Sequence, residues 1–285
     1  MKVDLHIHTT ASDGECAPEA TLELALRAGI RVLAIADHDT VAGTDAAAAR
    51  LAEKPEPALR LVPAVEFSTS HDGTELHILG YFPAGVPEAL RAFLAGVEAG
   101  RRGRIERGIE NLNRIGVPIT YEQVSRLARG RSIGRAHLAR ALVAAGNVPT
   151  FADAFDRYLG SQHDIVPSST SSTIAVIRSI REEWGGAAVW AHPPLPLVDG
   201  LTPVFAAAGL EGLEIYGTRR RTGGAQSLYL EALADAYGLC RSAGSDWHGW
   251  RGGARGRHED LEGVSVSVER IGPLLLRLGI RPQDA

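Results

Sequence analysis

Two histidines near the N-terminus, His6 and His8, are the first residues of the chain whose type and spacing could support chemistry. They lie in the short apolar run from Val3 to His8, which has the length of a buried strand. Side chains two residues apart in a strand point to the same side, so both imidazoles are expected to face one place. Neutral imidazole is a common metal ligand, and the pair therefore suggests a metal site. Two exposed histidines would have the same spacing, so the pair needs support from elsewhere in the chain.

Other histidines and carboxylates stand at or near the ends of later apolar runs. They are, in chain order, Asp13, His38, Glu66, His77, His192, Asp246 and His248. Enzymes built on α/β barrels place their sites at the C-terminal ends of the strands, so these side chains are expected to converge. A core histidine satisfied by hydrogen bonds would explain any single position, but that explanation would have to hold separately at each strand end. A cluster of metal ligands accounts for all of them at once.

Short apolar runs separated by helical patterns predict an α/β fold, either a barrel or an open sheet. The runs are Val3 to His8, Arg31 to Asp37, Leu61 to Phe67, Leu76 to Tyr81, Ala187 to Ala191, Gly212 to Tyr216 and Leu239 to Gly244. Helical patterns fill most of the gaps between them. One such pattern opens at Pro18 and closes at Gly29.

The connection between the third and fourth runs carries a turn signal, Asp72-Gly73, which predicts a hairpin. In that hairpin Ser68 pairs with His77, and Glu66 becomes a diagonal neighbour of His77 on the same face, about 7–8 Å away at the backbone. A bridging carboxylate and a terminal imidazole could then share one metal ion.

The middle of the chain, from about Gly100 to about Gln162, shows helical patterns and no convincing strand. We interpret it as a small all-helical insertion over the mouth of the barrel. The predicted organisation is a first part of the barrel in residues 1–99, the insertion in residues 100–164, and a second part of the barrel in residues 165–285.

The overall composition limits the possible partners. The net charge of the 285 residues is −4, so no general basic field is present to gather long nucleic acid, and duplex DNA binding is not expected. Of the 30 basic residues, only Lys2 and Lys54 are lysines, so any bound anion would be met mainly by arginine. No apolar stretch is long enough to span a membrane, and no obligate protein partner is evident. The two cysteines have no paired spacing, which favours a reduced, cytoplasmic protein.

Six segments, in order, resemble the motifs of the PHP (polymerase and histidinol phosphatase) family of metal-dependent phosphoesterases. They are DLHIHTTASDG, AIADHDT, VPAVEFS, LHILGY, AHP and GSDWH. The motifs extend from residue 4 to residue 248, so the resemblance covers the barrel portion of the chain. It implies a distorted seven-stranded (β/α) barrel with a small all-helical insertion.

The resemblance also implies three metal positions. The first would be held by His6, His8, Glu66 and Asp246, the second by Glu66, His77 and His192, and the third by Asp13, His38 and His248. Relatives often have histidine where this chain has Asp13, so the third position is the one whose ion and occupancy can differ. Mixed imidazole and carboxylate ligands suit Mn²⁺, Fe²⁺ or Zn²⁺ better than Mg²⁺ or Ca²⁺. The resemblance favours two or three Mn²⁺ ions.

The segment SIGRAHLARALVAAG resembles the insertion of one branch of that family, the TrpH-like or ribonuclease AM group, which includes 3′,5′-nucleoside bisphosphate phosphatases. This likeness implies a nucleotide or a short RNA end as substrate, hydrolysed by a hydroxide shared between two ions. Histidinol phosphate is an alternative substrate, and a PHP module that binds metal without catalysis is an alternative function. An amidohydrolase is a further alternative, but many of those enzymes bridge their metals with a carboxylated lysine, and neither Lys2 nor Lys54 is placed to bridge, whereas Glu66 is.

Substrate binding is predicted for Arg135 and His137. Ser132 has the residue type of an N-cap for a helix from Ile133 to Ala145, which would put Arg135 at the N3 position. A cation is unfavourable there, because the helix N-terminus already carries partial positive charge. A bound phosphate would relieve this conflict, so we expect Arg135, helped by His137, to hold one phosphate while the metals act on another.

Overall fold

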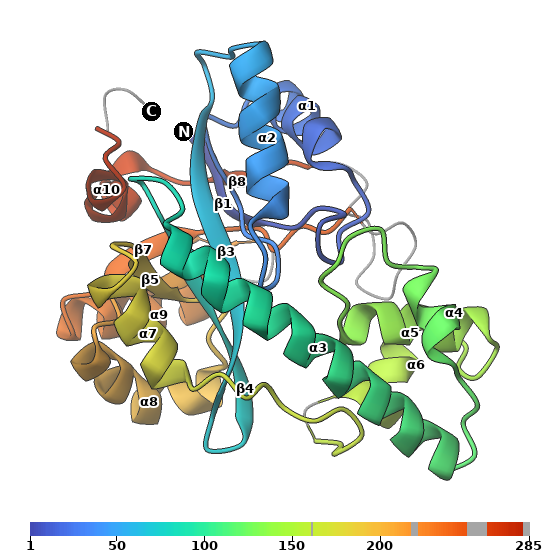
Figure 1. Ribbon diagram of the computed structural model, residues 1–285. Coiled ribbons are helices and arrows are strands. Elements are labelled where there is room, and N and C mark those ends of the chain that lie inside the picture. The colour runs from blue at the N-terminus through green and yellow to red at the C-terminus, as the bar shows by residue number, and fades with distance from the viewer. Residues whose placement is uncertain (161, 218–221, 250–260, 282–285) are drawn as a thin grey trace.

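The computed structural model describes residues 1–160, 162–217, 222–249 and 261–281 (Figure 1). Within these ranges eight strands form one sheet. They are β1 (Lys2–Ile7), β2 (Val32–Ile35), β3 (Arg60–His71), β4 (Thr74–Tyr81), β5 (Ala187–Trp190), β6 (Gly212–Tyr216), β7 (Cys240–Ala243) and β8 (Val264–Ser265). All seven predicted strands are present, but the predicted count of seven is wrong. The additional strand, β8, has only two residues, so it left no apolar run in the sequence.

The strand order is β7-β6-β5-β4-β3-β2-β1-β8. Most neighbours are parallel, whereas β4 is antiparallel to both β3 and β5, and β8 is antiparallel to β1. The predicted hairpin is confirmed, including the pairing of Ser68 with His77. Its turn residues, Asp72 and Gly73, have φ angles of 48° and 78°, which the Asp-Gly sequence accommodates.

The sheet curls until its two ends nearly meet. The amide of Asp246, just after β7, donates to the carbonyl of His6 at 2.8 Å, and the amide of His8 donates to the carbonyl of Trp247 at 2.8 Å. The result is a nearly closed barrel. These two hydrogen bonds place the ends of the first and the last parallel strand side by side, where both carry predicted ligands.

Helices cover the outside of the sheet (Figure 1). They are α1 (Pro18–Ala28), α2 (Ala42–Glu53), α7 (Thr173–Glu182), α8 (Leu195–Ala208), α9 (Ala225–Ala236) and α10 (Val268–Arg277). As predicted, α1 begins at Pro18 and ends at Gly29, whose φ of 73° suits glycine. The described residues contain no helix with the length and apolar character needed to cross a membrane.

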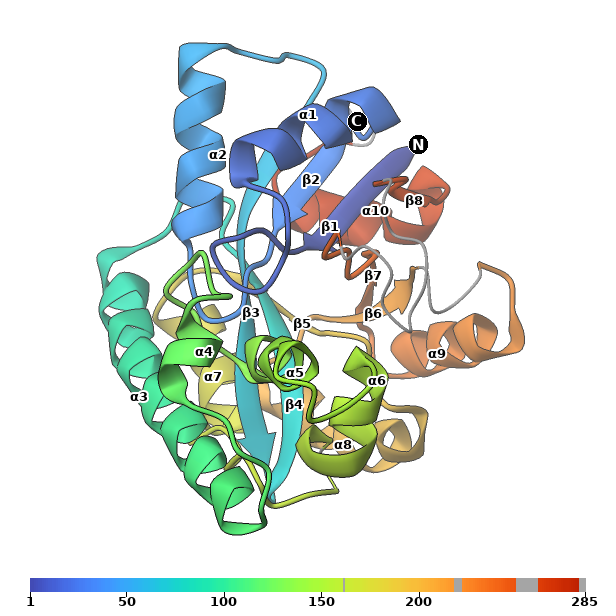
Figure 2. The same ribbon diagram turned by 90° about the vertical axis from the view of Figure 1, so that its right-hand side faces the viewer.

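The remaining helices form the insertion, which lies beside one end of the sheet (Figures 1 and 2). They are α3 (Glu88–Arg114), α4 (Tyr121–Ser125), α5 (Arg135–Ala144), α6 (Phe151–Ala154) and a π-helical turn, η1 (Phe155–Leu159). These helices have their own apolar cluster, which includes Leu112, Leu138 and Leu142. Helix α3 runs without a break through the expected boundary at residues 99 and 100, so that boundary is not a flexible linker. We still propose the division, with α3 as a rigid connection between the two parts.

Candidate metal centre

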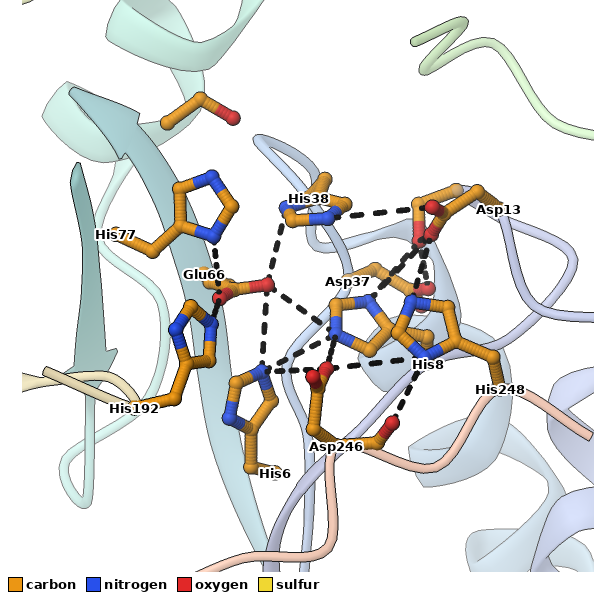
Figure 3. Close-up of polar contacts among 12 residues, drawn as sticks. His6, His8, Asp13, Asp37, His38, Glu66, His77, His192, Asp246 and His248 are labelled. Atoms are coloured by element: carbon orange, nitrogen blue, oxygen red, sulfur yellow. Dashed lines mark hydrogen bonds and ion pairs between the residues drawn. The ribbon is translucent and has the colours of Figure 1, made fainter. Parts of the chain in front are cut away.

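The structure brings all nine predicted ligands together at one end of the barrel (Figure 3). Glu66, near the middle of β3, lies at their centre. Its Oε1 is 2.9 Å from His77 Nδ1 and 3.0 Å from His192 Nε2. The diagonal arrangement predicted for Glu66 and His77 on the hairpin therefore brings their side chains into contact.

The other carboxylate oxygen of Glu66 faces three more imidazoles. Glu66 Oε2 lies 3.2 Å from the Nε2 atoms of His6 and His8, and 3.0 Å from His38 Nδ1. One carboxylate thus stands between five imidazole rings, which come from β1, β4 and the segments that follow β1, β2 and β5. This is the arrangement expected of a bridging ligand.

Distances between possible ligand atoms define three overlapping groups. They are His6, Glu66, His192 and Asp246; His38, Glu66 and His77; and His8, Asp13, His38 and His248. The groups differ from the implied sets in three ways: His192 replaces His8 in the first group, His38 replaces His192 in the second, and His8 joins the third. His8 reaches both sides of the site, with Nε2 3.4 Å from Asp246 Oδ1 and Nδ1 3.7 Å from Asp13 Oδ1.

Several donor atoms of the cluster face one another without forming hydrogen bonds, which is the arrangement of metal ligands. His38 Nδ1, His77 Nδ1 and Glu66 Oε2 are buried, close to partners, and yet take part in no hydrogen bond. His6 and His8 point their Nε2 atoms at each other across 3.1 Å. Buried polar atoms are normally hydrogen-bonded, and lone pairs that converge without a shared proton are what a cation requires. The residues present therefore fit a group of divalent ions.

Electrostatics keep the central carboxylate ionised. Burial raises the pKa of Glu66, but the charges of His38, His6 and His77 outweigh burial and hold that pKa well below its usual range. A negatively charged Glu66 is the form that a pair of cations needs.

Backbone conformations around the site are unusual. Asp39, His192 and Asp246 have positive φ angles of 52°, 28° and 56°. Residues other than glycine rarely adopt such angles, and where they do the cost is of order 1–3 kcal/mol each. Two of the three are predicted ligands, so the folded protein holds strained backbone at the points that aim side chains into the cluster.

Glu214 on β6 orients two of the ligands, a role that the sequence did not reveal. Its Oε1 lies 2.9 Å from His6 Nδ1, and its Oε2 accepts a hydrogen bond from the His192 amide at 2.7 Å. A proton on His6 Nδ1 would leave Nε2 free to act as the ligand atom. The available signal was the position of Glu214 in the strand run Gly212 to Tyr216, the same kind of place that holds Glu66.

Glu214→Gln is expected to weaken metal binding by about 10- to 100-fold, because the amide no longer fixes the tautomer of His6. The measurement is an equilibrium binding isotherm for Mn²⁺. Glu211→Gln is the matched control, since Glu211 pairs with Arg277 on the surface. Unchanged affinity in Glu214→Gln would show that the carboxylate charge does not orient His6.

A cavity of about 890 Å³ opens from the metal ligands towards the insertion. Besides the ligands, both polar and apolar side chains line it. The polar group is Ser68, Glu75, Arg101, Arg104 and Arg135, and the apolar group is Ile105, Ile133, Phe151, Phe155 and Val166. One continuous space therefore joins the cluster, three arginines and an aromatic end.

The structure corrects the local environment predicted for Arg135. Helix α5 has Gly134 as its N-cap, so Arg135 is at N1 and not at N3. Ser132 is not the cap, because its hydroxyl donates to the carbonyl of His38 at 2.5 Å. The guanidinium of Arg135 is paired with the carboxylate of Glu75, so an anion inside the protein already relieves the unfavourable charge.

His137 does not line the cavity, unlike Arg135. It is buried, and its Nδ1 accepts a hydrogen bond from the amide of Gly134 at 3.2 Å. Burial lowers the pKa of His137 to about 4, so the ring is neutral at pH 7. The geometry gives His137 a part in starting helix α5.

Comparison with known proteins agrees with the site. No protein-family model matches the chain. A 5′-3′ exoribonuclease from Haemophilus influenzae is 34% identical over 257 residues, which cover 87% of this chain and 92% of the relative. A 3′,5′-nucleoside bisphosphate phosphatase from Chromobacterium violaceum is 32% identical over 293 residues, which cover 99% of each chain.

Two solved structures are also similar to the chain. A protein from Bifidobacterium adolescentis, described as a metal-dependent phosphoesterase, is 32% identical with a TM-score of 0.80, and the match covers 96% of this chain and 95% of that one. A Chromobacterium violaceum protein called an amidohydrolase, solved with bound sulfate and no metal, is 28% identical with a TM-score of 0.84 and covers 99% and 98% of the two chains. With the ordered motifs and the convergent ligands, these likenesses show that the chain belongs to the PHP family of metal-dependent phosphoesterases.

Proposed function

We propose that this phosphoesterase hydrolyses a phosphate ester of a nucleotide, either a 3′,5′-bisphosphonucleoside or the end of a short RNA. The observation that carries the proposal is the single cavity joining the nine-ligand cluster to three arginines. One phosphate can lie at the cluster while a second lies at the arginines. The names of the two relatives, an exoribonuclease and a bisphosphate phosphatase, support the same substrate class.

The metal ligands in this proposal are His6, His8, Asp13, His38, Glu66, His77, His192, Asp246 and His248. We propose Mn²⁺ as the ion, with Zn²⁺ or Fe²⁺ as alternatives that the same donors accept. When bound, the ions supply an activated water at neutral pH and withdraw charge from the phosphoryl oxygens. Cys16 and Cys240 form no disulfide with each other, which suits the cytoplasm as the site of action.

The second phosphate would be held by three arginines that line the cavity, Arg101, Arg104 and Arg135, which we call the arginine layer. Arg101 contacts Asp39 and donates to Ser68 Oγ at 2.9 Å, while Arg104 and Arg135 share Glu75. Three guanidinium groups against two carboxylates leave one positive charge for an incoming anion. Guanidinium forks bind phosphate with two parallel hydrogen bonds, so this layer can also orient the nucleotide.

Neither lysine of the chain can provide the carboxylated bridge of an amidohydrolase. Lys2 donates to the carbonyl of Ala28, and Lys54 lies near Glu56, so both are outside the cavity. Glu66 occupies the bridging place instead. This observation favours phosphoester hydrolysis over the amidohydrolase alternative.

A substrate screen with Mn²⁺-loaded protein tests the proposal. The substrates are 3′,5′-bisphosphonucleosides, 3′- and 5′-mononucleotides, short 5′-phosphorylated RNAs and histidinol phosphate. We expect the bisphosphonucleosides or RNA ends to have the highest kcat/KM. A preference for histidinol phosphate would contradict the proposed substrate, and stoichiometric metal with no hydrolysis of any ester would favour the non-catalytic module.

Phe151→Ala is expected to raise KM for nucleotide substrates by about 10-fold, since stacking on an aromatic side chain contributes about 1–3 kcal/mol per base. The rings of Phe151 and Phe155 lie 5.1 Å apart between centroids and line the apolar end of the cavity. The loss should be similar for all four bases, because a phenylalanine ring offers a base no hydrogen-bonding group. Unchanged KM for every nucleotide, measured against p-nitrophenyl phosphate as the baseline, would place the base elsewhere.

A further inference from the structure

We infer that the helical insertion completes the metal position around Asp13 and His38, with Ser132 and Arg140 as positioning residues. The inference rests on the proposed ligand sets. It adds that the metal position of Asp13 and His38 depends on the helical insertion, although the insertion contributes none of the proposed ligands. Four contacts between the insertion and the barrel loops carry it.

The first contact fixes the segment that carries His38. Ser132 is 2% exposed, and its hydroxyl donates to the backbone carbonyl of His38 at 2.5 Å. The two residues are 94 positions apart in the chain. This partly buried hydrogen bond restrains the orientation of the His38 peptide, and the direction of the His38 side chain depends on that peptide.

The second contact fixes the loop that carries Asp13. Arg140, on helix α5, donates from Nη2 to the backbone carbonyl of Asp13 at 2.8 Å. The same nitrogen lies 3.9 Å from the carboxylate of Glu15, two residues further along the loop. One guanidinium from the insertion therefore reaches both ends of the short segment 13–15.

The third contact is a close approach of two backbones. A Cβ atom on Gly130 would lie 2.2 Å from the carbonyl oxygen of Ala11 and 2.5 Å from that of Thr10. No other residue fits there without moving the loop away. Glycine at this position lets the insertion lie directly against the segment that leads into Asp13.

The fourth contact connects the segment 130–134 to the loop of His38 and to strand β3. Arg101 donates to the carbonyl of Ile133 at 3.2 Å and pairs with Asp39, the neighbour of His38. Asp39 in turn accepts a hydrogen bond from the amide of Ser68 at 2.9 Å, two residues from Glu66. The segment 130–134 is thus hydrogen-bonded to the loop of His38 and lies directly against the loop that leads into Asp13.

These contacts hold the loops of Asp13 and His38, which are two of the four ligands in the group His8, Asp13, His38 and His248. His8 directly follows β1 and His248 lies in the segment after β7, and the barrel joins these two segments through the bond between the His8 amide and the Trp247 carbonyl. Asp13 and His38 are on loops, where small displacements are easier. Partners outside the ligand shell usually change metal affinity by about 10- to 100-fold, so losing these contacts should selectively weaken this position.

The test is an Mn²⁺ binding isotherm, with free ion followed by electron paramagnetic resonance, on Ser132→Ala, Arg140→Ala and the double variant. We expect one class of sites to lose about 10-fold in affinity in each single variant. Arg140→Ala should leave the other classes unchanged, whereas Ser132→Ala should also weaken the group of His38, Glu66 and His77, because His38 belongs to both groups. Arg131→Ala is the matched control, since Arg131 is in the same segment, is 88% exposed and pairs with Glu98. Arg140→Lys, which keeps a donor near the Asp13 carbonyl, should recover part of the loss and guards against a variant that merely unfolds.

The outcomes separate this inference from the proposed function. Wild-type affinities in all three variants, or an equal loss in every class of site, would overturn the positioning role while leaving the hydrolytic proposal intact. A wild-type protein that binds metal in all classes but hydrolyses no phosphate ester would overturn the proposed function, and the selective loss in the variants would still support the inference.

Discussion

Glu66→Gln is expected to remove most of the bound metal and to lower kcat/KM by roughly 1,000-fold or more, since bound ions typically contribute several kcal/mol to catalysis of this kind. Both oxygens of Glu66 face imidazole nitrogens at 2.9–3.2 Å. An amide keeps only one oxygen and presents N–H donors at the other position, where a ligand needs a lone pair. The substitution also removes the one full negative charge at the centre of the cluster.

The measurements are metal content per chain by elemental analysis and turnover on the best substrate from the screen. Glu106→Gln is the control, because Glu106 is a partly exposed residue whose partner is Arg102 in the preceding turn of α3. Thermal unfolding of the metal-free proteins checks that both variants fold. Full metal content together with wild-type turnover in Glu66→Gln would remove Glu66 from the centre of the mechanism.

The ligand cluster was predictable from the sequence because each member is at or near the end of an apolar run. Strand ends are visible as local patterns, and the barrel brings them to one place whatever the details of packing. The hairpin of β3 and β4 was predictable for a similar reason, since Asp72-Gly73 specifies the turn and the turn specifies the register. Both successes depend on signals contained in a few neighbouring residues.

The residues around the ligands were not predictable in this way. Glu214 contacts His6 across 208 positions of the chain, and nothing near residue 214 indicates that partner. Arg101 and Arg104 are two of 28 arginines, so their residue type alone could not select them. Ser132 has the residue type of a helix cap, but its hydroxyl donates to the carbonyl of His38 and does not cap helix α5.

Glu75 shows that some of the missing information was nevertheless present. It precedes His77 by two residues on the same strand, so both side chains point to the same side as Glu66. Its carboxylate lies 3.8 Å from His77 Nε2, and it also pairs with Arg104 and Arg135. Burial raises the pKa of Glu75, but His77 and the two arginines outweigh burial and leave the pKa below its usual range. Glu75 therefore links a metal ligand to the arginine layer.

The second large effect is expected at Arg135. Arg135→Ala should raise KM for a 3′,5′-bisphosphonucleoside by about 10- to 100-fold, since hydrogen bonds between charged groups contribute about 1.5–3 kcal/mol. Two causes act together. The variant loses a guanidinium that lines the cavity, and it leaves the carboxylate of Glu75 with one arginine fewer to neutralise it. The uncovered negative charge would then repel a phosphate approaching the same place.

The two causes can be separated by a double variant. Glu75→Gln combined with Arg135→Ala removes the repulsion but not the lost guanidinium, so KM should recover only in part. p-Nitrophenyl phosphate, which has a single phosphate, reaches the metal cluster without using the arginine layer and should show little change in Arg135→Ala. Arg102→Ala is the matched control on the insertion, because Arg102 is 65% exposed and does not line the cavity. Equal losses on both substrates would mean that Arg135 supports the structure of the site and does not bind the second phosphate, and unchanged KM on both would leave its pairing with Glu75 as its whole role.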